Sequence, residues 1–278
     1  MRKHTTVASS GVERLVPADV APIAANEATW TVEGSWRLLK SNAVPVHNTG
    51  AFPNPGNPNR ITVQSVTAQV PVAPKVAASP TKVKLPGWAL NGVPFDPGAG
   101  EFYQGDPSLG WQYEALSGAV SLGIDENHAH VQPTGIYHYH GLPTLFLEAQ
   151  GVRFEAHSPQ VGWAADGFPI YALYGYEDAK DGSSAIIEHS SSYRLKEGTR
   201  PSGDGQPGGA YDGTFNADYE YVEGAGTLDE CNSIWTVTPE FPEGTTAYFL
   251  SASHPVVPRC VVGTPDRSMR RPPPPKRP

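Results

Sequence analysis

Hydrophobic and polar positions alternate in short runs along the chain, and the clearest run spans residues 61–72. Its apolar side chains fall at every second position, first at Ile61 and Val63 and then at Val66, Ala68, Val70 and Val72. Alternation of this kind places one set of side chains on the buried face of a β-strand. The change of parity near Ser65 predicts a β-bulge within this strand.

Further short runs rich in β-branched and aromatic residues predict more strands. These runs lie at residues 30–40, 83–85, 114–122, 136–140, 144–148, 169–174 and 245–251. No window keeps a helical period over three turns, and glycine and proline, at 29 residues each, interrupt helices and suit tight turns. We therefore expect an all-β fold, a single sandwich-like or barrel-like domain rich in turns and loops.

The two ends of the chain differ in pattern from its middle. Residues 1–28 lack periodicity, which predicts a flexible N-terminal arm. We expect residues 29–266 to form one domain. The segment 267–278 is basic and rich in proline, which predicts a disordered tail.

The charge balance narrows the classes of partner. A formal net charge of −8 argues against binding to nucleic acid, and no run of about 20 apolar residues predicts a membrane span.

The N-terminus lacks the apolar segment of a signal peptide, so the protein is cytosolic or its leader is missing from this sequence. Cys231 and Cys260 fit either one disulfide in an exported protein or two free thiols.

The most informative segment is DENHAHVQPTGIYHYH, residues 125–140, which holds four of the nine histidines. His128 and His130 lie two residues apart, as do His138 and His140, and residues at this spacing share a face of a strand. The interleaved tyrosines at positions 137 and 139 should point to the other face and pack in the core. Tyr139 is also a candidate redox partner for a metal.

The linker between the two pairs decides whether the histidines meet. Pro133-Thr134-Gly135 suits a three-residue hairpin loop, with glycine at the left-handed position. This loop sets His130 opposite His138 and His128 opposite His140, with all four rings on one face. A two-residue loop would put the pairs on opposite faces.

Clustered neutral imidazoles are good ligands for copper and zinc, and no cysteine lies nearby to form a structural zinc site. We therefore predict a transition-metal site, with His130, His138 and His140 as ligands and His128 as a fourth. The alternative is that these strand histidines have only a structural role.

Three residues elsewhere could contribute to the site. His47 lies in a loop rich in proline and asparagine, and His157 lies in HSPQVGWAADGFPIY; both are candidate ligands. Asp166 precedes Gly167 in a predicted turn and is a candidate catalytic residue or a partner that orients a histidine. Loop histidines and turn aspartates also occur with no such role.

The segment GIDENHAHVQPTGIYHYHGLP, residues 123–143, resembles the YHYH-domain family. Stretches such as WALNGVPFDPGAGEFY, HSPQVGWAADGFPIYALYGY and VVPRCVVGTP extend the resemblance over residues 30–266. The resemblance implies an exported or surface-associated protein, secreted or periplasmic, with Tyr137, His138, Tyr139, His140 and His130 as its motif residues. His128 matches the pattern less securely.

These features lead to three hypotheses for function. The first is binding of a transition metal, copper preferred, with oxidoreductase chemistry on a small-molecule substrate. The second is a zinc-type hydrolase, for which Asp166, Asp125 or Glu126 would supply the general base. The third is a non-enzymatic module that binds a metal, a glycan or a surface ligand. The chain has no GxSxG, HExxH or Walker A motif to favour another class.

Overall fold

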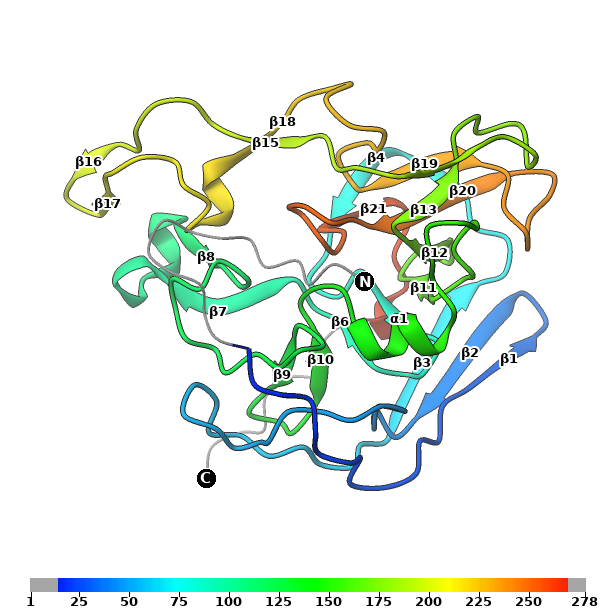
Figure 1. The fold of residues 1–278 in the computed structure, drawn as a ribbon, viewed down its shortest axis with the longest axis horizontal. Helices are drawn as coiled ribbons and strands as arrows, with labels where there is room; N and C mark the ends of the chain where they lie inside the picture. The colour runs from blue at the N-terminus through cyan, green and yellow to red at the C-terminus, as the bar shows by residue number, and fades with distance from the viewer. Residues whose placement is uncertain (1–14, 270–278) are drawn as a thin grey trace.

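Figure 1 shows the fold of the protein, a computed structural model that describes residues 15–269. Short strands dominate it, and the all-β prediction is confirmed. None of the sheets formed by the described residues closes into a barrel, so the barrel-like alternative is not realised.

The elements of the described residues are short and separated by many turns. The strands are β1 Thr29–Glu33, β2 Trp36–Ser41, β3 Val66–Pro71, β4 Val76–Lys82, β5 Gly87–Ala89, β6 Pro94–Phe95, β7 Gly98–Phe102, β8 Gln112–Glu114, β9 Ala129–Val131, β10 Tyr137–Tyr139, β11 Gly162–Ala164, β12 Pro169–Ala172, β13 Tyr174–Tyr176, β14 Ile186–Glu188, β15 Tyr193–Leu195, β16 Ser202–Gly203, β17 Gln206–Pro207, β18 Tyr219–Tyr221, β19 Ser233–Thr236, β20 Thr245–Leu250 and β21 Cys260–Gly263. The helices are α1 Thr144–Ala149 and the 3-10 turns Tyr103–Gly105, Pro107–Leu109, Asn216–Asp218 and Arg267–Met269.

The largest sheet has eight strands in the order β19-β20-β12-β11-β5-β6-β10-β9. It is mixed, because β12 pairs with β20, and β6 with β10, in parallel. Large aromatic side chains from these strands, such as Tyr139, Tyr248 and Phe95, are fully buried and fill the core. The sheet therefore supplies a rigid base, and the β9–β10 hairpin forms one end of it.

A separate three-stranded sheet, β1-β2-β3, changes two of the predicted elements. Residues 30–40 form a hairpin rather than one strand, because Gly34 takes a left-handed φ of 60° and lets Glu33 pair with Trp36. The predicted bulge at Ser65 is wrong, since β3 begins after it, at Val66.

The run at 144–148 is not a strand but the helix α1. Thr144, Phe146 and Leu147 are its buried residues, which is one face of a helical turn. The side chain of Asn127 accepts a hydrogen bond from the Leu145 N–H at 3.0 Å and so satisfies a donor in the first turn of the helix. A run of five residues is too short for its period to separate helix from strand.

The other predicted strands are found in part. The runs 136–140, 169–174 and 245–251 contain β10, β12 and β20. Residues 83–85 connect β4 to β5, and of residues 114–122 only the first belongs to a strand, β8.

The two cysteines and the two ends of the described chain are fixed by specific contacts. Cys231 and Cys260 form a disulfide and are not two free thiols. The described part of the predicted arm, residues 15–28, is bonded to the domain through the bridge between Val20 and Thr49. The start of the predicted tail forms the turn Arg267–Met269, and the rest, 270–278, lies outside the described residues. Among residues 15–269 no helix has the length and apolar character to span a membrane.

A buried carboxylate, Asp125, positions the histidine hairpin. Its Oδ2 accepts hydrogen bonds from the Gly50 N–H at 2.8 Å and the Tyr137 hydroxyl at 2.7 Å. Its Oδ1 accepts from the N–H groups of Asn127 at 2.9 Å and Ala129 at 3.3 Å. Burial raises the pKa of Asp125 to about 6, although these donors oppose the rise. One side chain thus connects the loop at Gly50, the turn before β9, and β10.

Removal of the Tyr137 hydroxyl should therefore destabilise the protein. We expect Tyr137→Phe to lower the free energy of unfolding by about 1–3 kcal/mol, because a buried carboxylate oxygen loses a donor. Urea unfolding at pH 7.5 measures the change. Tyr221→Phe, at a more exposed position, is the control and should change stability by less than about 0.5 kcal/mol; equal losses in both variants would contradict the role of the hydroxyl.

Candidate metal centre

The β9–β10 hairpin has the predicted register. The Gln132 N–H donates to the Ile136 carbonyl at 2.9 Å, which closes a three-residue loop, and Gly135 in that loop has a φ of 86°. Antiparallel pairing then sets His130 opposite His138. A residue with a Cβ would be strained at position 135, so the glycine is required by the loop.

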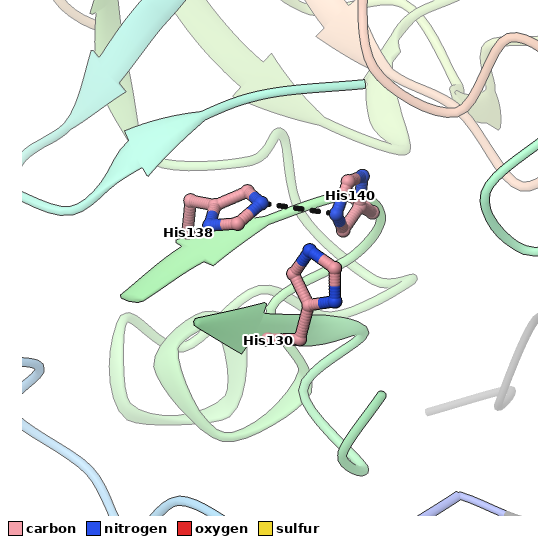
Figure 2. Close-up of side chains that lie close together, drawn as sticks. All are labelled: His130, His138 and His140. Carbon is pink, nitrogen blue, oxygen red and sulfur yellow. Dashed lines mark hydrogen bonds between the residues drawn. The ribbon is translucent and has the colours of Figure 1, made fainter. Parts of the chain in front are cut away.

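Three imidazole rings meet on one face of this hairpin, as Figure 2 shows. Ring centroids are 4.6 Å apart for His130 and His138, 4.6 Å for His130 and His140, and 4.7 Å for His138 and His140. One ring nitrogen from each lies within 4.8 Å of the other two. His138 and His140 are buried and His130 is partly exposed, so the cluster opens to solvent on the side of β9.

Backbone carbonyls set which nitrogen of two rings carries the proton. Nδ1 of His130 lies 2.9 Å from the Leu122 carbonyl, and Nδ1 of His138 lies 3.2 Å from the Ile136 carbonyl. A carbonyl only accepts, so each Nδ1 donates and each Nε2 has its lone pair. Nε2 of His138 lies 3.0 Å from Nε2 of His140, and a proton on His140 completes that hydrogen bond (Figure 2).

His128 does not join the three, which corrects the expectation of four rings on one face. Its φ is 53°, in the left-handed region, because its N–H bonds back to the Asp125 carbonyl at 2.8 Å and closes a turn. The alternation of β9 starts only after it, at Ala129. Its Nδ1 instead contacts the Leu142 carbonyl at 2.8 Å, within the core.

The tyrosines of the motif occupy the other face of β10, as predicted, and both are fully buried. The Tyr139 hydroxyl lies 2.7 Å from Nε2 of His47 and 2.9 Å from Nδ2 of Asn91. His47 therefore contacts the tyrosine face and is not brought to the three-histidine cluster. Burial lowers the pKa of His47 and raises that of Tyr139, so both are neutral near pH 7.

His157 and Asp166 lie elsewhere in the core. Nδ1 of His157 donates to the Ser158 carbonyl at 2.7 Å, and its ring packs against Tyr176. Asp166 accepts a hydrogen bond from the Tyr248 hydroxyl at 2.6 Å and from the Gly263 N–H at 2.8 Å. The structure brings neither residue to the cluster. Their sequence contexts gave no information on this long-range placement.

A hollow of about 400 Å³ adjoins the cluster, and we call it the histidine hollow. It is lined by residues of the loop 56–59, of β7, of β9 and of the hairpin turn, together with Leu122, His130 and His138. Asn57 and Asn59 attach the loop to β9, since each side-chain amide donates to the Val131 carbonyl, at 2.9 Å and 2.8 Å. The hollow gives small molecules access to two of the three rings.

One residue that could take part in chemistry here, Glu101, was missed from the sequence. It lies on β7 and is one of the residues that line the histidine hollow. An acidic residue between glycine and phenylalanine in PGAGEFY gave only a weak signal. Only the tertiary structure shows that it lines the same hollow as His130 and His138.

A buried histidine away from the cluster, His189, should make stability depend on pH. Burial, followed by the nearby charge of His157, lowers the pKa of His189 from 6.5 to about 4. Between these two pH values the unfolded chain binds more protons than the folded protein. The contribution of His189 to stability is therefore complete above pH 6.5 and is lost as the pH falls toward 4.

We expect His189→Gln to reduce the pH dependence of stability, by up to about 3 kcal/mol between pH 7.5 and pH 4. Glutamine does not titrate and can still bond to Thr227, whose Oγ1 lies 3.1 Å from Nδ1 of His189. Urea unfolding at the two pH values gives the difference for each protein. The same pH dependence in the variant and the wild type would show that His189 does not contribute.

Comparisons with known proteins identify the family of the chain. No curated protein matches the chain, and no solved structure matches it. The model of one family, described as YHYH protein, matches residues 67–263, which is well over half of the chain and includes the whole histidine hairpin. The chain therefore belongs to the YHYH protein family.

Proposed function

We propose that the protein binds one transition-metal ion through Nε2 of His130, His138 and His140, with copper preferred. The observation that carries this proposal is the convergence of the three rings, two of which have Nδ1 bonded to a backbone carbonyl. Such bonds orient histidine ligands in metal sites and leave Nε2 for the ion. His140 needs only to move its proton from Nε2 to Nδ1 to become the third ligand.

The distance between two of the ligand nitrogens suits an ion of this class. Zinc binds imidazole nitrogen at 2.0–2.1 Å, so two ligands of a tetrahedral ion lie about 3.3 Å apart. The 3.0 Å between Nε2 of His138 and Nε2 of His140 is within a few tenths of an ångström of this separation. The donor set is three imidazoles, and the affinity of such sites for divalent ions is highest for copper.

Three protein ligands leave at least one coordination position for a small molecule, and the histidine hollow gives access to it. A metal bound there would supply either one-electron chemistry or a Lewis acid that activates water. An oxidoreductase that acts on a small molecule is the first of these readings. In such an oxidoreductase Tyr139, which lies between His138 and His140 in the sequence, is a candidate for electron transfer.

The alternative is a zinc-type hydrolase, and one observation favours it. Glu101 lines the histidine hollow and could accept a proton from water. The bases considered from the sequence are bound elsewhere: Asp125 accepts four donors, Asp166 bonds to Tyr248, and Glu126 accepts the Ala18 N–H at 3.2 Å. A non-enzymatic module that holds the metal to bind a glycan or a surface is the third reading.

An exported protein, secreted or periplasmic, fits the proposal. The Cys231–Cys260 disulfide is of the kind that persists in oxidising compartments, where most secreted proteins fold. The same compartments supply oxygen for copper chemistry.

Metal content tests the proposal. We expect about one copper or zinc ion per chain in untagged protein after reconstitution with both metals, and less than about a tenth of this in His138→Ala/His140→Ala, because two of three ligands are gone. Mass spectrometry of the metals measures it. The control His157→Gln/His189→Gln removes two buried histidines outside the cluster and should keep the metal; its loss there would place the ligands elsewhere, and no metal in the wild type would overturn the proposal.

The hydrolase alternative has its own test. In zinc-loaded protein, Glu101→Gln should lower the rate of 4-nitrophenyl acetate hydrolysis by about 100-fold, because a general base is lost, while the zinc content stays unchanged. Gln104→Glu, a charge change outside the lining of the hollow, is the control. An unaltered rate in Glu101→Gln would remove Glu101 from this role.

A further inference from the structure

A second hollow, of about 520 Å³, lies next to the histidine hollow along β7. It is lined by Lys82 and Lys84 at the end of β4, by Arg259 beside β21, and by residues of β7. We call it the cationic hollow. Gly98 and Gly100 of β7 line both hollows, so these two glycines form the boundary between them.

The backbone does not require glycine at either position. Neither Gly98 nor Gly100 has a left-handed φ. A Cβ at Gly100 would meet nothing within 4 Å, and one at Gly98 would come no closer than 3.6 Å, to Nε2 of Gln112. A Cβ at either position would therefore meet no close contact, and the absence of a side chain leaves the boundary between the hollows low.

The charge of the cationic hollow differs from that of the molecule as a whole. The chain has a net charge of −8. Among the described residues that line this hollow, however, Lys82, Lys84 and Arg259 stand with one carboxylate, Asp96, which accepts a hydrogen bond from Gln132 at 2.8 Å. The backbone holds the three cations together, since Lys82 pairs with Cys260 and the Val83 N–H donates to the Arg259 carbonyl.

The Arg259 guanidinium loses hydration because it is largely buried. Burial lowers the pKa of Arg259, although Oε1 of Glu114 lies 3.6 Å from its Nη2. Its side chain is still one-quarter exposed, toward the hollow. A guanidinium in this state gains from an anion that reaches it, because carboxylates and phosphates bond to it with charge-assisted hydrogen bonds.

We propose that the two hollows form one groove for an acidic oligosaccharide, with a carboxylate at Lys82, Lys84 and Arg259 and the rest of the chain extending across Gly98 and Gly100 to the histidines. Gly98 to Gly100 alone spans about 7 Å of strand, so a simple inorganic anion cannot reach from one end to the other. Amide and hydroxyl side chains of Asn57, Asn59, Gln132 and Thr134 line the histidine end and suit a ligand rich in hydroxyl groups.

The proposal deepens the proposed function, because it makes the metal site the reactive end of the groove. Binding of the carboxylate end, however, needs no metal. The test therefore uses the full chain after dialysis against a chelator, with trigalacturonate as the probe, neutral maltotriose as its matched comparison, and calorimetry at low salt.

We expect wild-type protein to bind trigalacturonate and to bind maltotriose at least about tenfold more weakly. Lys82→Ala/Lys84→Ala should weaken trigalacturonate binding by about tenfold, because two ionic contacts are lost. The control Lys40→Ala/Lys180→Ala removes the same charge from exposed positions outside both hollows and should bind within about twofold of wild type.

Gly100→Val tests whether the groove is continuous. A Cβ there meets no atom within 4 Å, so we expect the melting temperature to stay unchanged while trigalacturonate binding falls about tenfold. Undiminished binding by Gly100→Val or by the lysine variant would overturn the proposal, as would equal binding of the two sugars or no binding of either. His138→Ala/His140→Ala should still bind trigalacturonate, so a failed metal site and a failed groove give different results.

Discussion

A carboxylate buried without counter-charge, that of Asp125, determines the geometry around the histidines. Such a group costs free energy unless donors surround it, and the protein supplies four. To do so, the loop at Gly50, the turn before β9 and the Tyr137 hydroxyl must all converge. The turn starts β9 at Ala129, and the contact to Tyr137 fixes β10 against it. The rings of His130 and His138 are placed by the same set of contacts.

The two faces of β10 carry different side chains, and these are held in place by different partners. On one face Tyr137 and Tyr139 are fully buried, and each hydroxyl has a hydrogen-bond partner. On the other face main-chain carbonyls orient two of the imidazoles, His130 through Leu122, which precedes the hairpin, and His138 through Ile136 within it. Because the orienting groups are backbone atoms, these two rings are held in position by the fold itself.

Local patterns predicted the features that depend on local chemistry. The register of the hairpin followed from PTG at 133–135, because the loop type sets strand pairing, and the tyrosine face followed from the period of a strand. His128 could not be placed in this way, since its backbone hydrogen bond to Asp125 puts it in a turn and the alternation of the strand starts one residue after it. Glu101, His47 and Asp166 depend on contacts between distant segments, for which one sequence holds no signal. The helix at Thr144–Ala149 was missed because its run is shorter than two helical turns.

The alternation in Tyr137–His138–Tyr139–His140 also limits how this family can diverge. A single insertion or deletion in the hairpin would exchange the faces, so that imidazoles would enter the core and phenols would line the hollow. A substitution in the hairpin changes one of its faces, whereas a change in the length of the hairpin disrupts both faces together. Substitutions in the walls that β7 and the loop at 56–59 contribute would instead reshape the hollow while the alternation of the hairpin stays intact.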